Sequence, residues 1–218
     1  MHYIGWDLVG FLQDLSIHSL MKKFSNYIKN FPEMLEKSIP SHIDLSCVDI
    51  WQQDESRVGQ QGSLSRIWAP TGTRTRKVKQ QQFLSTYIYG AACASTGEAF
   101  GLVLPYTNTE SMQVFLDELS QQAIPGRHIA LVMDNAGWHT AKELAIPKNI
   151  TLLPLPSYSP ELNAMEQVWE WMKSHYLSNC NFKNYNEIVD KICSAWNQFA
   201  QQPNLIKSIC TRDWLVTP

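Results

Sequence analysis

Three acidic residues of this chain have the types and positions of a divalent-cation site. Asp134 directly follows the apolar run 129–133, which is typical of a buried strand. Asp54 follows a second strand-like run, 43–51, and Glu166 lies in a segment with helical periodicity. Carboxylate oxygens are the ligands that Mg²⁺ prefers in proteins. Two carboxylates at strand ends and a third on a later helix therefore predict a site for phosphoryl transfer.

Helix phasing distinguishes Glu166 from two neighbouring glutamates. At about 100° per residue, Glu166 falls within the apolar stripe of its helix, whereas Glu161 and Glu170 fall at the edges of that stripe. A carboxylate within an apolar stripe is unfavourable unless it is paired or bound to a cation. Lys173 also falls within the stripe, so a structural ion pair with Glu166 is the alternative to a metal site.

The composition is that of a globular protein with one sizeable core. The chain has 218 residues, of which 44% are hydrophobic and 17% are charged. No apolar run approaches the ~20 residues of a membrane span, and the N-terminus lacks the basic region of a secretory signal. The five cysteines form no CxxC pair, which argues against structural zinc and a disulfide framework. These features predict a cytoplasmic protein.

Basic residues are concentrated in one segment of the chain. The net charge of −2 argues mildly against a stand-alone nucleic-acid binder, although bound cations would neutralise the acids of a metal-dependent nuclease. The segment 66–79 contains five basic residues and no acid. It is either a solvated surface hairpin or a strip that contacts phosphates. The five candidates are Arg66, Arg74, Arg76, Lys77 and Lys79.

The order of the predicted elements places the acids in an α/β fold. A helical region within residues 1–40 comes first, and three strands joined by tight connections then favour an antiparallel unit. Later strands separated by helices favour parallel additions. Asp54 belongs to the first strand and Asp134 to the fourth, which are neighbours if the sheet is ordered as in ribonuclease H. The predicted strands are 44–52, 83–93, 98–105, 128–133 and 150–155, with a short one near Trp68, and the later helices are 107–122, 159–177 and 187–202.

Several segments of the chain match the motifs of a known family. They are 54-DESRVGQQG-62, 66-RIWAPTGTR-74, 87-YIYGA-91, 131-LVMDNAGWHTAKEL-144 and 151-TLLPLPSYSPELNAMEQVWEWMK-173. Through them the chain resembles the DDE transposases of bacterial insertion sequences, in the branch related to the mariner superfamily. The resemblance covers roughly residues 45–177. It implies a ribonuclease H-like fold, in which helices flank a mixed sheet.

The resemblance also implies a function and its residues. Asp54, Asp134 and Glu166 match the catalytic triad of the family, which binds two Mg²⁺ or Mn²⁺ ions. The implied reaction is cleavage of DNA strands and strand transfer at transposon ends by in-line phosphoryl transfer. The implied partners are transposon terminal inverted repeats and target DNA, with a homodimer as the active complex, no membrane, and a location in the bacterial cytoplasm at the nucleoid. Lys173 and the basic segment are candidates to contact phosphates, and His139 is a lesser candidate because a structural role suits it better.

The chain departs from the family pattern in two places. Ala164 stands where the family usually has proline after the motif SPELN, which we expect to alter only the first helical turns. Only about forty residues precede the first predicted strand, fewer than the helix-turn-helix DNA-binding region of the family needs. We therefore expect an N-terminally truncated protein. Residues 1–42 would be a helical linker or remnant of that region, and residues 43–218 would be the catalytic domain.

Three other functions stay open on the residues alone. A structure-selective nuclease or a ribonuclease H would use the same fold and the same acids. A truncated, non-mobile transposase remnant would fold without acting, although the intact triad argues against it. A glycosidase would also use two carboxylates, but no pattern of sugar-stacking aromatic residues supports one.

Overall fold

The central feature of the structure is one mixed sheet. The computed structural model describes residues 6–62, 68–73, 76, 80–139, 141, 143–157 and 159–215, with side chains from residue 21 onward. Within these residues, five strands form a sheet in the order β3-β2-β1-β4-β5. β1 pairs antiparallel with β2 and parallel with β4, while β2–β3 is antiparallel and β4–β5 is parallel. The strands are β1 (Val48–Gly59), β2 (Ser85–Cys93), β3 (Glu98–Leu104), β4 (His128–Met133) and β5 (Ile150–Pro154).

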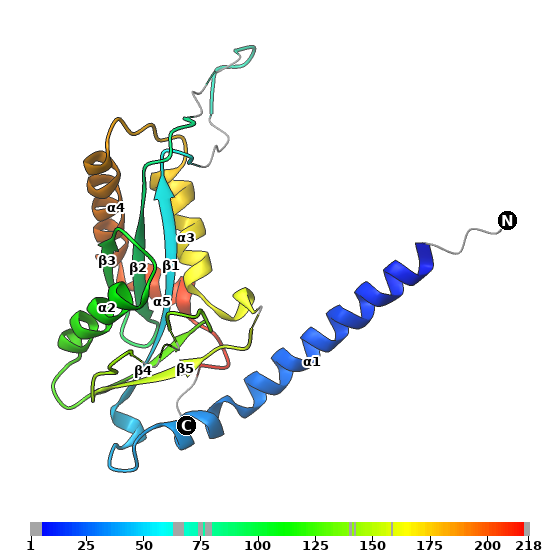
Figure 1. Cartoon of the computed structure of the whole chain (residues 1–218), viewed down its shortest axis with the longest axis vertical. Coiled ribbons are helices and arrows are strands. Elements are labelled where there is room, and N and C mark those ends of the chain that lie inside the picture. The colour runs from blue at the N-terminus through cyan, green and yellow to red at the C-terminus, as the bar shows by residue number, and fades with distance from the viewer. Residues whose placement is uncertain are drawn as a thin grey trace.

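Helices cover both faces of this sheet (Figure 1). α2 (Thr109–Gln122) packs on one face. Three helices and the end of α1 pack on the other face. These helices are α1 (Trp6–Ser38), α3 (Met165–Met172), α4 (Tyr185–Ala200) and α5 (Pro203–Cys210).

Burial on both faces explains the apolar character of the inner strands. All six residues of β4 are buried, because helices cover the sheet on each side of this strand. On the first face, α2 begins at Asn108, whose side chain accepts a hydrogen bond from the backbone N–H of Ser111 (2.8 Å). Phe115 of α2 is fully buried against Tyr89 of β2. The sheet is therefore a rigid platform for the polar residues at its rim.

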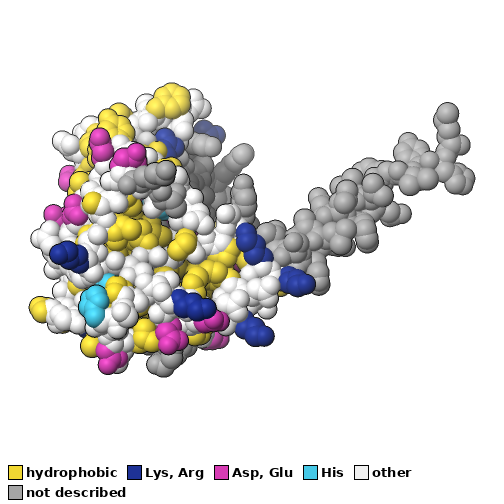
Figure 2. Space-filling model, turned by 60° about the horizontal axis from the view of Figure 1, so that its bottom comes forward, with side chains coloured by type: hydrophobic (Ala, Val, Ile, Leu, Met, Phe, Trp, Pro, Cys, Tyr) yellow, Lys and Arg dark blue, Asp and Glu magenta, His cyan; other side chains and the backbone are white. Residues whose placement is uncertain are grey.

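α1 projects from the body of the protein, and its C-terminal turns pack on the core (Figure 1). Phe31 and Leu35 are fully buried in the cluster that contains residues of β4 and β5. Figure 2 shows Lys and Arg side chains around the base of this helix, beside exposed hydrophobic side chains. α1 has 33 residues, yet no helix in the described ranges is both long and apolar enough to cross a membrane.

The first strand differs most from its prediction. β1 continues to Gly59, so Asp54 lies within the strand and not after its end. The residues that follow Trp51 are polar, and a strand prediction based on apolar alternation stops there. The short strand predicted near Trp68 is absent from residues 68–73, where this side chain is fully exposed.

The helix predicted over residues 159–177 is divided into three parts. A 3₁₀ turn (Pro160–Leu162) precedes α3, and a π turn (Lys173–Leu177) follows it. Asn163 has an extended backbone (φ −91°, ψ 111°), which separates the 3₁₀ turn from α3. α5 is an addition to the predicted elements, because eight residues after a proline give little periodicity to detect.

Candidate active site

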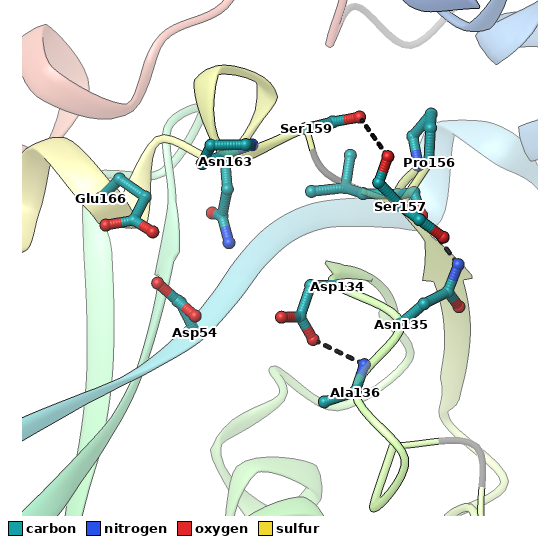
Figure 3. Close-up of a pocket in the computed structure, with 11 residues that line it drawn as sticks. Asp54, Asp134, Asn135, Ala136, Pro156, Ser157, Ser159, Asn163 and Glu166 are labelled. Carbon is teal, nitrogen blue, oxygen red and sulfur yellow. Dashed lines mark hydrogen bonds between the residues drawn. The ribbon is translucent and has the colours of Figure 1, made fainter.

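The structure brings Asp54, Asp134 and Glu166 together in one pocket of about 450 Å³. Asp54 comes from β1, Asp134 follows β4, and Glu166 lies in the first turn of α3. Figure 3 shows the carboxylates of Asp54 and Glu166 directed toward one another, with that of Asp134 on the other side of Asp54. The side-chain amide of Asn163 also points into the pocket (Figure 3).

The register between β1 and β4 explains why the two aspartates meet. The last pair of this parallel ladder is Gln52 opposite Val132, and β4 ends at Met133. Asp54 and Asp134 each lie two residues beyond that pair. They are therefore level with one another and directed to the same face of the sheet.

Buried polar contacts fix the position of α3 beside the aspartates. The side-chain amide of Asn163 donates from Nδ2 to the backbone oxygen of Gln53 (2.9 Å). The backbone N–H of Ala164 donates to Oε1 of Gln52 (2.8 Å). Asn163 and Gln52 are both buried, so water does not compete for these bonds. Together they set the position at which Glu166 enters the pocket.

Glu166 faces the pocket while the apolar side chains of α3 pack behind it. Val168 and Met172 are fully buried, but Glu166 is exposed and does not lie within the buried stripe that phasing predicted. The ion pair that forms joins Lys173 Nζ to Glu170 (3.6 Å), in place of the Glu166–Lys173 pair considered from the sequence. The carboxylate of Glu166 is thus available at the pocket.

Asp54 is half-buried beneath α3. Its Oδ2 accepts a hydrogen bond from Nε1–H of Trp169 (2.9 Å). Burial raises the pKa of Asp54 from 3.8 to about 7; the Trp169 bond opposes this rise, and the negative charges of Glu55 and Glu166 add to it. A carboxylate whose charge is disfavoured in this way is stabilised by a bound cation.

His139 connects Asp134 to Glu55 beside the pocket. Its Nδ1 lies 2.8 Å from Asp134 Oδ1 and its Nε2 lies 2.8 Å from Glu55 Oε1, and its side chain is 1% exposed. Burial alone would lower the pKa of His139, but the hydrogen bonds to both carboxylates outweigh it and raise the pKa to about 10. The bond from His139 also lowers the pKa of Asp134. His139 therefore bonds to the carboxylates of Asp134 and Glu55 through its two ring nitrogens, and neither nitrogen is free to contact a phosphate.

The ligand atoms of the pocket fit a hard divalent cation. Its acids supply oxygen ligands, and no Lys or Arg occurs among the described residues that line it. In the described ranges, no three His, Cys, Asp or Glu side chains lie close enough together to surround one ion.

Two of the basic residues predicted to contact DNA can be placed. Lys173 lines a second pocket, of about 100 Å³, together with Arg57. Arg57 was missed from the sequence, although it follows Asp54 by three residues on the same strand. Arg76 is exposed. The other four candidates, Arg66, Arg74, Lys77 and Lys79, lie outside the described residues.

Most of the chain, residues 49–189, matches the family model described as DDE superfamily endonuclease. The chain belongs to this family. All three acids of the pocket lie within the matched residues. A protein of Sinorhizobium fredii, described as uncharacterized protein y4pE/y4sA, is 48% identical over 128 residues, which are 59% of this chain and 95% of that protein.

Solved structures of Mos1 transposase share the fold of this DDE-family chain. The Mos1 paired-end complex with the left transposon end has a TM-score of 0.57 and 17% identity, over 86% of this chain and 61% of that chain. The Mos1 strand transfer complex has a TM-score of 0.54 and 18% identity, over 88% and 62% of the two chains. The ribonuclease H-like fold expected from the sequence is confirmed. The chain spans about three fifths of the length of these Mos1 chains.

Proposed function

We propose that this chain is the catalytic part of a transposase, which cleaves DNA at transposon ends and joins the freed ends to target DNA. The observation that carries the proposal is the pocket into which Asp54, Asp134 and Glu166 open, in a member of the DDE endonuclease family. The Mos1 structures, which are paired-end and strand transfer complexes, support DNA as the partner. Those solved with Mn and with Mg support a divalent cation at this pocket.

Each acid has a separate part in holding the cations. Asp54, which Figure 3 shows between the other two, would bind both of two Mg²⁺ or Mn²⁺ ions. Asp134 would hold one of them and Glu166 the other. When bound, the ions would lower the pKa of an attacking water and offset the negative charge on the leaving oxygen. His139 would keep Asp134 ionised and oriented, because its Nδ1–H donates to that carboxylate.

The reaction would proceed as two in-line displacements at phosphorus. In the first, the oxygen of a water molecule forms a bond to the scissile phosphorus, and the bond to the 3′-oxygen of the neighbouring nucleotide breaks. The freed 3′-hydroxyl then attacks a phosphorus of target DNA, and the target strand leaves through its own 3′-oxygen. Neither displacement needs a covalent bond between protein and DNA.

Basic residues beyond the acids would hold the DNA backbone. Lys173 and Arg57, at their shared pocket, and the segment 66–79 are the candidates for phosphate contacts. Residues 1–42 would form a linker to DNA-binding elements, and residues 43–218 the catalytic domain. A homodimer would bring two transposon ends together, in the bacterial cytoplasm at the nucleoid.

The test is nicking of supercoiled DNA by the full chain with Mn²⁺ or Mg²⁺. We expect Asp134→Asn and Glu166→Gln to abolish nicking, because each removes a charged metal ligand and retains the shape of the side chain. Glu170→Gln is the matched control, since this exposed acid lies on the same helix and outside the pocket. Equal nicking by the wild type and Asp134→Asn would refute the assignment.

The choice of substrate separates the proposal from its alternatives. Joining of precut terminal-repeat DNA to a target plasmid supports a transposase. Cleavage of RNA–DNA hybrids without such joining supports a ribonuclease H or a structure-selective nuclease. A folded protein that cleaves none of these substrates with either metal is a remnant.

A further inference from the structure

Two glycines lie beside Asp54 on the neighbouring strands of the sheet. Asp54 on β1 is opposite Gly90 on β2, and Gly90 is opposite Gly101 on β3. A Cβ atom at Gly90 would lie 2.6 Å from the ring of Trp169 and 2.8 Å from that of Trp196. A Cβ at Gly101 would lie 2.5 Å from Trp196. The two indole rings therefore contact the backbone of the sheet directly. Any residue larger than glycine at position 90 or 101 would clash with them.

This close contact with the sheet brings the Trp169 ring within hydrogen-bond distance of Asp54. Trp169 is 3% exposed, and its ring centroid lies 5.8 Å from that of Trp196. An indole N–H is a donor only, and a buried one needs an acceptor. The acceptor is Asp54 Oδ2, at 2.9 Å. Trp169 also follows Glu166 by one helical turn, so a single turn of α3 supplies both an acid of the pocket and a partner for the aspartate facing it.

We propose that Trp169 is a positioning residue for Asp54. The indole N–H of Trp169 fixes the orientation of the Asp54 carboxylate for binding of a divalent cation. The inference rests on the proposed function, in which Asp54 is a metal ligand. The indole takes one lone pair of Oδ2, and the carboxylate still lines the pocket. A side chain that merely filled the space on Gly90 could be an aromatic ring without an N–H group.

The substitution Trp169→Phe keeps a smaller aromatic ring at this position and removes the donor, so its loss of packing must be compared with that of a matched variant. Trp196→Phe is the matched control, since it makes the same change in the adjacent ring, for which the structure shows no bond to Asp54. Mn²⁺ affinity of the full chain is measured by electron paramagnetic resonance. Loss of a hydrogen-bond partner behind a metal ligand weakens metal affinity by about 10–100-fold. We expect a loss in this range for Trp169→Phe and no more than about twofold for Trp196→Phe.

Melting temperatures without metal show whether each variant is folded, and Asp54→Asn shows whether Asp54 binds the ion. If Trp169→Phe is folded and binds Mn²⁺ as the wild type does, or if the two phenylalanine variants lose affinity equally, the positioning role is wrong. If Asp54→Asn also leaves Mn²⁺ affinity unchanged, the proposed metal site itself fails. A second measurement is the indole ¹H–¹⁵N resonance of Trp169, which should shift on Mg²⁺ addition by more than that of Trp196. Equal shifts would contradict the inference.

Discussion

The substitution Ala164→Pro tests how α3 is held against the sheet. The sequence resemblance described above implies proline at this position, where this chain has alanine. The backbone of Ala164 (φ −66°) suits proline, and the extended conformation of Asn163 (ψ 111°) suits a residue that precedes one. The N–H of Ala164, however, donates to Oε1 of Gln52 (2.8 Å), and proline has no N–H. The change therefore keeps the backbone angles and removes one buried hydrogen bond, and Oε1 of Gln52 must move away from the proline ring, whose Cδ replaces the amide hydrogen.

The expected loss of stability follows from two opposing contributions. Gln52 is 1% exposed, so its Oε1 would be left without a donor and without water. An unsatisfied buried acceptor costs about 1–3 kcal/mol, and a compatible proline stabilises by about 0.4–1 kcal/mol through the unfolded chain. With both contributions near the middle of their ranges, the net result is a decrease of about 1–2 kcal/mol in the free energy of unfolding. For a chain of this length, that decrease lowers the melting temperature by about 2–8 °C.

A double-mutant cycle with Gln52→Leu assigns this loss to the hydrogen bond. Free energies of unfolding are measured by urea denaturation for the wild type, both single variants and the double variant. With the acceptor removed, Ala164→Pro should be neutral or stabilising by about 0.4–1 kcal/mol. If proline destabilises both backgrounds equally, the cost is steric and the reasoning is refuted. A stabilising effect in the wild-type background would refute it as well.

Two further substitutions test the polar residues around the pocket. His139→Ala should lower the free energy of unfolding by about 3–5 kcal/mol, because it removes the cationic partner of the buried Glu55 carboxylate, which keeps the hydrogen bond from Gln53 Nε2 (3.1 Å). Urea denaturation measures the loss, Glu55→Gln in the same background should recover part of it, and a loss below about 1 kcal/mol would contradict a buried ion pair. Lys173→Ala should weaken DNA binding at every sequence and reduce the slope of log affinity against log salt concentration by about 1. Lys183→Ala, a change at an exposed lysine that does not line the pocket of Lys173, should leave the slope unaltered, and equal slopes for both variants would show that Lys173 does not contact DNA.

The sheet was largely predictable because its strands carry local signals. The apolar run before Asp134 and the β-prone segments around Tyr89 and Leu102 gave strands whose ends are within two residues of those observed. The strands of Asp54 and Asp134 were expected to be neighbours if the sheet is ordered as in ribonuclease H, and in the structure β1 and β4 are adjacent. These features depend on residues near one another in the chain, which is why they can be read from it.

The polar contacts of the site could not be predicted, because their partners are distant in the sequence. Glu55 and its partner His139, for example, are 84 residues apart. Gln52 and Gln53 lie at the predicted end of the first strand. Their oxygens accept hydrogen bonds from residues more than a hundred positions later, in the segment that leads into α3. The motif SPELN is part of the family resemblance, but its sequence does not indicate what each residue contacts. The fold shows that Asn163 of this motif bonds to β1.

Three consecutive residues of β1 accept hydrogen bonds from the segment that carries Glu166. Gln52 accepts from the backbone of residue 164, Gln53 from the side chain of residue 163, and Asp54 from the side chain of residue 169. Apolar packing is non-directional and would tolerate a helix displaced along the sheet. A slip of one residue would move Glu166 by about 1.5 Å and rotate it by about 100° about the helix axis. Hydrogen bonds hold only over a few tenths of an ångström, so these three bonds allow a single register. The distance between Asp54 and Glu166 is therefore set by polar contacts, while the apolar core supplies most of the stability.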